Sequence, residues 1–320
     1  MHINTSPLMV SVYNRELHFK KCIESLKACK FSEKSHLFIA IDAPFRDEDI
    51  DANKRIIQYS KEIFGFKEIT LLIRPENYGA YKNLILAKNE IFSKYNRLIM
   101  FEDDNIFSPD FLNFVNKGLN IYQEREDIFS VSGYQYPIIM PPGYKKDIYL
   151  WQGFSAWGVG IWKEKWEKVD WEEEKALKSI RQFLKNYKAV YQHQKTANHY
   201  FPAILKMVEQ NRLHGDGYLS LYQFLNNMYS VFPVTSRVRN MGHDGSGIGC
   251  GYMENDIYAQ QAIYSRQDDY TFPQNIQNEE LLNQVLYQHF KIPLKSKLKA
   301  ILKLLLFNSG LLKQGTKWPI

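Results

Sequence analysis

Short apolar runs alternate with amphipathic runs over residues 6 to 101, and this alternation limits the possible folds more than any other property of the sequence. The apolar runs predict strands at 6–14, 36–44, within 67–80 and at 97–101. Between them the spacing predicts helices over 15–29, 47–64 and 81–95. Strands that alternate with helices in this way predict an α/β fold with a mainly parallel sheet and helices on both of its faces.

Polar and charged residues follow each of these strands. They are Tyr13, Asn14 and Arg15 after the first strand, Asp42 after the second, Arg74 after the third, and Glu102, Asp103 and Asp104 after the fourth. The carboxyl ends of parallel strands meet at one edge of a sheet, and α/β proteins bind their ligands beyond that edge. The sequence therefore predicts a ligand site built from these residues.

The stretch RLIMFEDDN places three carboxylates directly after an apolar strand. Glu102, Asp103 and Asp104 repel one another and resist burial unless a positive group lies among them. A divalent ion, Mg²⁺ or Mn²⁺, accepts such carboxylates and keeps other positions free for phosphate oxygens. The alternative is a cluster of acids at a helix start, but Ser108 and Pro109 are expected to supply the cap and first turn of the next helix.

Several classes of protein do not fit the sequence. A net charge of +6 is modest for 320 residues, and no block of like charge resembles a nucleic-acid-binding arm. No glycine-rich turn follows the first strand, and the GSGIGCG stretch at 245–251 has Cys250 where a nicotinamide-binding motif needs its last glycine. No P-loop motif occurs either.

The cysteines and the apolar runs indicate a location. Cys22 and Cys29 lie about 10 Å apart along a predicted helix, too far for a disulfide, and no cysteine has the spacing of a zinc site. The first strand begins by about residue 8, which leaves no room for a signal peptide, and no apolar run is long enough to span a membrane. We therefore expect a cytoplasmic protein.

The character of the sequence changes after about residue 130. A segment rich in Trp, Tyr, Pro and Gly predicts loops and short strands, residues 172–230 are mostly helical in pattern, and 230–251 reads as a strand followed by a glycine-rich loop. We divide the chain into a first half, 1–130, a second half, 131–270, and a helical tail, 271–320.

Six ordered stretches resemble one enzyme family. They are YNR after the first strand, RPENYGAYKN, the strand and EDD followed by SPDFL, SAWGVGIWKEKW, GDGYLSLYQF and RVRNMGHDGSG. Together they resemble the GT-A nucleotide-sugar glycosyltransferases, in the branch with N-acetylglucosaminyltransferase I and bacterial O-antigen and capsule transferases. The resemblance covers residues 8 to 251, and it implies that 1–130 is a donor-binding half and 131–270 an acceptor-binding and catalytic half. It implies a Rossmann-like fold, a nucleotide-diphosphate sugar donor (a UDP-sugar is expected), a divalent metal, and inversion at the sugar carbon.

The resemblance also implies roles for the strand-end residues. Asp104 matches the metal ligand, while Glu102 and Asp103 match residues that contact metal-bound water and the ribose. The nucleotide is expected against Tyr13, Asn14, Arg15 and Asn77. Asp42 matches a carboxylate that reads the base, although pairing with a strand-end arginine would explain it equally well. Arg74 and Lys82 could neutralise the diphosphate or form surface salt bridges.

Asp216 matches the family's general base, which takes a proton from the acceptor hydroxyl. An ordinary helix N-cap is the other explanation for Asp216, and Glu209 is a substitute candidate for the base.

Many relatives have a histidine in the glycine-rich loop where this chain has Gly249 and Cys250. His243 lies earlier in that loop and could contact phosphate or metal instead, or cap the turn. Trp151, Trp157 and Trp162 could stack on sugars or pack in the core.

The C-terminal segment 291–318 predicts an amphipathic helix with Leu294, Leu298, Ile301, Leu302 and Leu305 on one face and lysines along its border. Such a helix suits an anionic membrane surface, which would make the protein peripheral on the inner face of the membrane. The alternative is that the helix docks on the catalytic domain.

A glycan or a lipid-linked saccharide is the expected acceptor. A metal-dependent nucleotidyltransferase and a non-catalytic sugar- or nucleotide-binding protein are the rival functions.

Overall fold

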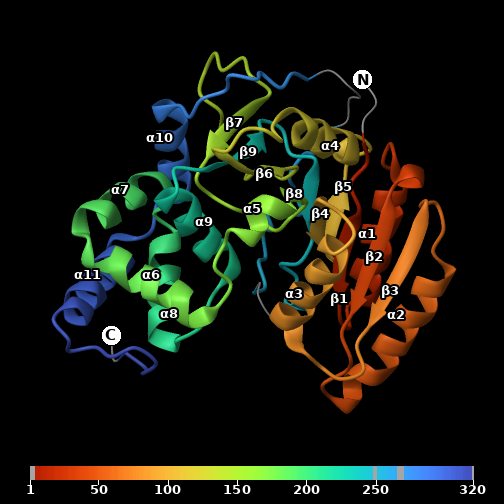
Figure 1. Cartoon of the computed structure of the whole chain (residues 1–320), viewed down its shortest axis with the longest axis horizontal. Coiled ribbons are helices and arrows are strands. Elements are labelled where there is room, and N and C mark those ends of the chain that lie inside the picture. The colour runs from red at the N-terminus through yellow and green to blue at the C-terminus, as the bar shows by residue number, and fades with distance from the viewer. Residues whose placement is uncertain (1–3, 248–250, 265–269, 319–320) are drawn as a thin grey trace.

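The computed structural model describes residues 4–247, 251–264 and 270–318, and its centre is an eight-stranded sheet with the order β3-β2-β1-β4-β8-β6-β9-β7 (Figure 1). The first four strands in sequence, β1 to β4, pair in parallel. The strands of the sheet are β1 Leu8–Val12, β2 His36–Ile41, β3 Glu68–Ile73, β4 Arg97–Glu102, β6 Ile128–Ser132, β7 Ile148–Trp151, β8 Val159–Trp162 and β9 Tyr229–Pro233. The predicted α/β fold with a mainly parallel sheet is confirmed.

Helices cover both faces of the sheet because side chains alternate along each strand. On β1, Leu8 and Val10 point into a core shared with α1 (Glu16–Lys27), α2 (Ile50–Glu62) and α4 (Phe111–Ile121). The intervening residue Met9 points into a second core on the opposite face, which contains α3 (Gly79–Phe92). The predicted helices on both faces are therefore confirmed.

The sheet continues across the expected boundary between the two halves. The antiparallel strand β8 lies between β4 and β6, so a strand from the second half joins the parallel part of the sheet. β9 pairs in parallel with β6, and β7 closes the edge. Residue 130, the expected end of the first half, falls inside β6.

In the second half, residues 172–230 are mostly helical, as predicted, and further helices precede and follow this stretch. The helices are α5 Lys163–Glu167, α6 Glu173–Lys185, α7 Tyr187–Ala197, α8 Tyr200–Gln210, α9 Gly215–Leu225, α10 Glu280–His289 and α11 Leu294–Asn308. Helix α11 packs on α6 and α8, away from the parallel strands (Figure 1). No helix within the described residues is both long and apolar enough to cross a membrane.

One local prediction was wrong. Ser108 and Pro109 do not form the cap and first turn of a helix, because α4 begins at Phe111 with Asp110 at its N-cap position. Residues before it instead form a short strand, β5 (Asn105–Phe107), which pairs with β10 (Val238–Asn240). The backbone N–H of Ser108 continues this pairing with a hydrogen bond to Arg237.

Candidate active site

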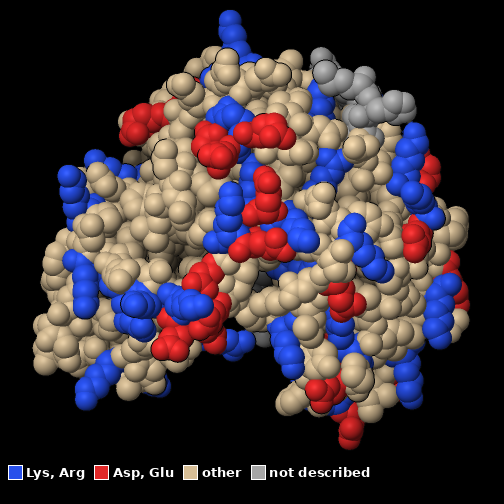
Figure 2. All heavy atoms as spheres, in the orientation of Figure 1, with Lys and Arg blue, Asp and Glu red and all other residues tan. Residues whose placement is uncertain are grey.

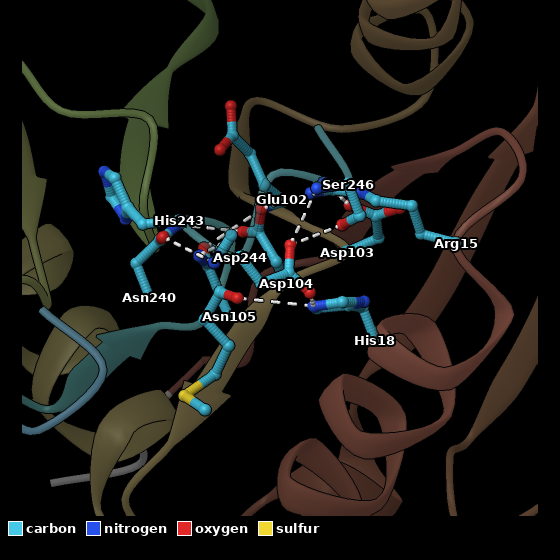
Figure 3. A network of polar contacts seen from close by, with 12 residues as sticks. Arg15, His18, Glu102, Asp103, Asp104, Asn105, Asn240, His243, Asp244 and Ser246 are labelled. Atoms are coloured by element: carbon cyan, nitrogen blue, oxygen red, sulfur yellow. Dashed lines mark hydrogen bonds and ion pairs between the residues drawn. The ribbon is translucent and has the colours of Figure 1, made fainter. Parts of the chain in front are cut away.

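The positive group among the three carboxylates is a guanidinium (Figure 3). Arg15 donates to both oxygens of Asp103, and its Nη1 lies 2.8 Å from Asp104 Oδ2. Arg15 is the N-cap residue of α1, three residues after the end of β1, and β1 pairs in register with β4 so that Ser11 lies opposite Glu102. The parallel pairing of two strands therefore brings Arg15 next to the acidic end of β4.

The second oxygen of Asp104 is also engaged. Asn240 donates to Asp104 Oδ1 at 2.8 Å and Asn105 donates to the same atom at 3.1 Å. The N–H of Met241 bonds to the Asp104 carbonyl at 2.9 Å, so the chain after β10 lies directly against this residue. A Cβ atom at Gly242 would collide with the Asp104 carboxylate, so only glycine fits there.

Glu102 points toward a different group of residues. Its Oε2 accepts a hydrogen bond from Nε1 of Trp157 at 2.9 Å. Burial, followed by the negative charges of Asp104, Asp216 and Asp103, raises the pKa of Glu102 to about 8. Burial raises the pKa of Asp103 only to about 6, because the Arg15 charge opposes it.

Asp216 lies in the first turn of α9, close enough to Glu102 for its charge to raise the pKa of that residue. His214 holds the N-cap position, so the expected alternative, Asp216 as a cap, is not what the structure has. Burial raises the pKa of Asp216 to about 7, against the lowering effects of the Ala156 backbone N–H and the Lys88 charge. A carboxylate that titrates near neutrality is suited to proton transfer.

Lys88 on α3 is an unexpected part of this site. Its side chain is buried, and its Nζ lies 3.8 Å from the centroid of the Trp166 ring. Burial lowers the pKa of Lys88 well below its usual value, and the charge of Asp216 raises it. Lys88 and Asp216 therefore influence each other's ionisation.

Tyr13 and Asn14 converge on a carboxylate that the sequence reasoning did not single out. The Tyr13 hydroxyl and the Asn14 amide each donate to Asp49 at 2.7 Å. Asn53 links this cluster to the end of β2 by donating to the carbonyls of Tyr13 and Asp42. The polar groups after β1 and β2 thus form one connected network.

Asp42 lies buried in that network, and no arginine within residues 4–247, 251–264 and 270–318 pairs with it, in contrast to one of the two expectations for it. Its Oδ1 accepts the backbone N–H groups of Tyr78 at 2.9 Å and Ala43 at 3.1 Å. Asn77 donates to the Ala43 carbonyl at 2.7 Å and so ties the loop before α3 to the end of β2.

Arg74 and Lys82 have local partners. Arg74 donates to Asn83 and to Glu90 of α3, each at 2.7 Å. The Lys82 ammonium lies 4.2 Å from the centroid of the Tyr78 ring. Neither side chain lies in the Arg15 network.

His243 packs beside Glu102's partner Trp157. Its ring stacks on Tyr258 with centroids 4.7 Å apart and meets Trp157 edge-on at 5.8 Å. Figure 3 shows it next to Asn240 and Glu102 rather than next to Arg15. Gly249 and Cys250 stand where many members of the family that this chain resembles have a histidine. Both lie outside the described residues.

Two of the three tryptophans considered for sugar stacking are core residues. Trp151 and Trp162 are buried, whereas Trp157 is partly exposed and bonds to Glu102. Glu209, the substitute for Asp216, instead binds Lys303 at 3.1 Å and the N–H of Trp318 at 2.9 Å, which fixes the C-terminal segment.

The acidic side chains of the described residues do not by themselves complete a metal site. Among residues 4–247, 251–264 and 270–318, no group of three His, Cys, Asp or Glu side chains is arranged to hold one. Mg²⁺, however, binds through one or two carboxylates and completes its shell with water and substrate phosphates, and Mn²⁺ accepts the same oxygen ligands. Asp103 and Asp104 suit such an ion if it replaces the Arg15 guanidinium beside them.

Two residues of this site, Asp49 and Lys88, were not predicted from the sequence. The hydrogen bond from Trp157 to Glu102 and the close approach of Gly242 to Asp104 were not predicted either. Asp49 could have been suspected, because it lies in an acidic run directly after a strand–loop segment. Lys88 gave no signal, because one lysine in an amphipathic helix usually lies at the surface.

No model of a known protein family matches this chain, and no curated protein matches its sequence. Among solved structures, the mannosyltransferase PcManGT from Pyrobaculum calidifontis, in complex with GDP-Man and Mn²⁺, is 14% identical with a TM-score of 0.36, over 53% of this chain and 49% of that one. TarS 1–349 from S. aureus is 10% identical with a TM-score of 0.39, over 73% of this chain and 60% of that one.

The same S. aureus protein in complex with UDP-GlcNAc is 11% identical with a TM-score of 0.34, over 49% of this chain and 45% of that one. This chain therefore matches about half of the length of these structures, up to 60% in the longest match. Likenesses at such low TM-scores do not decide the function, which has to be argued from the site.

Proposed function

We propose that the protein is an inverting GT-A glycosyltransferase that moves a sugar from a nucleotide-diphosphate donor to an acceptor hydroxyl. One observation carries the proposal. At the carboxyl edge of the parallel strands, Asp103 and Asp104 surround a guanidinium, while Glu102 and Asp216 lie nearby with pKa values raised to about 8 and 7. A group for binding charge and a group for moving a proton thus lie side by side.

The donor side consists of the ends of β1, β2 and β4. The fork of Arg15 donors matches a pair of phosphate oxygens as well as it matches Asp103. The uridine would lie against the network of Tyr13, Asn14 and Asp42. A divalent ion on Asp103 and Asp104, when bound, would offset the charge that grows on the leaving diphosphate.

On the acceptor side, Asp216 is the general base. The acceptor oxygen bonds to the anomeric carbon as its proton passes to an Asp216 oxygen, and the bond between that carbon and the diphosphate oxygen breaks. The nucleoside diphosphate leaves with the bonding electrons. The acceptor would be a glycan or a lipid-linked saccharide of the kind used in capsule or lipopolysaccharide synthesis, and the sugar a hexose or an N-acetylhexosamine.

The rival functions differ in their products. A nucleotidyltransferase releases pyrophosphate from a nucleoside triphosphate, and a binding protein releases nothing. The test is a titration with UDP and GDP, with and without Mn²⁺, followed by a screen of sugar donors that detects the released nucleoside diphosphate. Metal-dependent UDP binding with release of UDP supports the proposal. Release of pyrophosphate, or nucleotide binding without any turnover across donors and acceptors, would refute it.

A further inference from the structure

Helix α11 carries an apolar face that the rest of the described chain leaves uncovered. Leu294, Leu298, Leu302 and Leu305, here called the leucine face, are between 44% and 71% exposed. Their spacing places them on one side of the helix. Ala300 and Leu304 on the opposite side are buried against the body of the protein. The helix therefore needs only one of its two apolar sides for folding.

The leucine face borders a wide apolar groove. The groove has a volume of about 1180 Å³ and runs between α7, α10 and α11, with Ile301 and Lys297 of α11 on its wall. Ile139 and Leu281 also line it, and Ile139 is 90% exposed. Groove and leucine face together form one apolar surface that is much wider than a single helix side.

The charges along α11 have one sign, whereas Glu280 of α10 lines the groove beside it. Residues 291–318 contain seven lysines and no acidic residue. Lys295 and Lys299 lie along one border of the leucine face and are exposed, while Lys297 lies along the other border. Figure 2 shows Lys and Arg side chains separated by uncharged surface on the side of the molecule where Figure 1 places α7 and α11.

Helix α11 is held in a fixed orientation. Lys303 bonds to Glu209 of α8 at 3.1 Å, and Asn308 donates to the Leu184 carbonyl of α6 at 2.9 Å. Glu209 also accepts the N–H of Trp318, so the chain beyond the helix returns to the body. The leucine face is thus presented by a docked helix and not by a free tail.

We infer that the leucine face and its lysine borders bind an anionic lipid bilayer, with the helix lying in the plane of the membrane surface. Leucines enter the acyl boundary while lysine stems extend to the headgroups. A second copy of this chain is a poorer occupant, because self-pairing of the face would bring lysine rows together. The protein would then work at the cytoplasmic face of a membrane. This inference does not depend on the proposed reaction.

The test is co-sedimentation of the full-length protein with vesicles of phosphatidylglycerol and phosphatidylcholine, and with vesicles of phosphatidylcholine alone. Wild type should bind the anionic vesicles, and more weakly as salt is raised. The double variant Leu298→Glu, Leu302→Glu should lose about tenfold or more in binding per leucine. Lys295→Gln with Lys299→Gln should lose about fivefold per lysine, on the anionic vesicles only.

The matched control is Leu17→Glu, on α1 in the other half of the chain, because Leu17 is 71% exposed, as is Leu294. It should bind vesicles as wild type does. Circular dichroism of all variants checks the fold, which exposed positions should not affect. Absence of wild-type binding, or equal binding by the glutamate variant, overturns the inference. So does concentration-dependent dimerisation that the glutamates abolish, which would assign the surface to a second copy.

Discussion

The two sides of the acidic cluster differ although they are built from neighbouring residues. On one side, Asp103 faces the Arg15 guanidinium, and its pKa is about 6 in spite of burial. On the other side, Glu102 faces an indole and Asp216, and its pKa is about 8. β4 ends at Glu102 and the chain turns at Asp103 and Asp104, so one step along the chain separates the two environments.

This difference shows how one short acidic stretch, residues 102–104, can contribute both to donor binding and to proton transfer. Asp103 and Asp104 lie beside the Arg15 guanidinium, where the guanidinium or a metal ion on the carboxylates can bind phosphate. Glu102 and Asp216 have pKa values raised to about 8 and 7 and can move protons. Changes on the Arg15 side should therefore impair donor binding, and changes on the Asp216 side should impair turnover or shift its pH dependence.

The largest effect is expected from Asp104→Ala. The change removes the carboxylate that Arg15, Asn105 and Asn240 share, and transfer should be abolished together with the Mn²⁺-dependent part of UDP binding. UDP titration with and without Mn²⁺ and an assay of released UDP measure both effects. Asp51→Ala, an exposed acid on α2, is the control. Normal turnover of the Asp104 variant with Mn²⁺ would show that the metal assignment is wrong.

Asp216→Asn should lower the maximal rate by about 10² or more, the scale of general-base loss, while the donor still binds. Single-turnover rates and UDP-sugar titration separate the two quantities. Glu209→Gln should leave the maximal rate within the wild-type range. A variant that bound the donor poorly yet reached the normal maximal rate would move Asp216 from catalysis to structure.

Lys88→Met tests the coupling between Lys88 and Asp216. A base must be ionised, so wild-type activity should rise as the pH increases through about 7. Without the Lys88 charge the pKa of Asp216 should be higher, and the rising limb should move up by about one pH unit. Lys82→Met, on the same helix, should leave the profile in place. An unshifted limb in the Lys88 variant would show that Lys88 is neutral in the working enzyme.

The smallest effect is expected from Glu102→Gln on stability. An acid whose pKa is raised in the folded state binds more protons there than in the unfolded chain, so stability falls as the pH rises from 4.5 to about 8. The glutamine side chain of the variant carries no charge at any pH, so the variant does not lose stability in this way as the pH rises. At pH 9 the variant should therefore melt at least about 2 to 4 °C above wild type, with little difference at pH 5. Thermal melts across the pH range test this, and a lower melting temperature at pH 9 would contradict it.

Local patterns were enough to predict the first half of the fold. The strands up to β4 and the helices between them follow from apolar periodicity, because each element is specified by its own residues. The same reasoning placed Arg15, Asp42 and Asp104 at strand ends. It was wrong at Ser108, because β5 is specified by its pairing with β10, more than a hundred residues later in the chain.

By itself, the sequence determined that polar groups gather beyond one edge of a parallel sheet, since the order of strands and helices leaves few topologies. Only the tertiary structure decided which group meets which. Arg15 reaches Asp103 because β1 pairs with β4, Trp157 reaches Glu102 because of the fold of the second half, and α11 keeps four leucines uncovered because α6 and α8 take its other side. These choices depend on side-chain directions and distant partners, which no local pattern records.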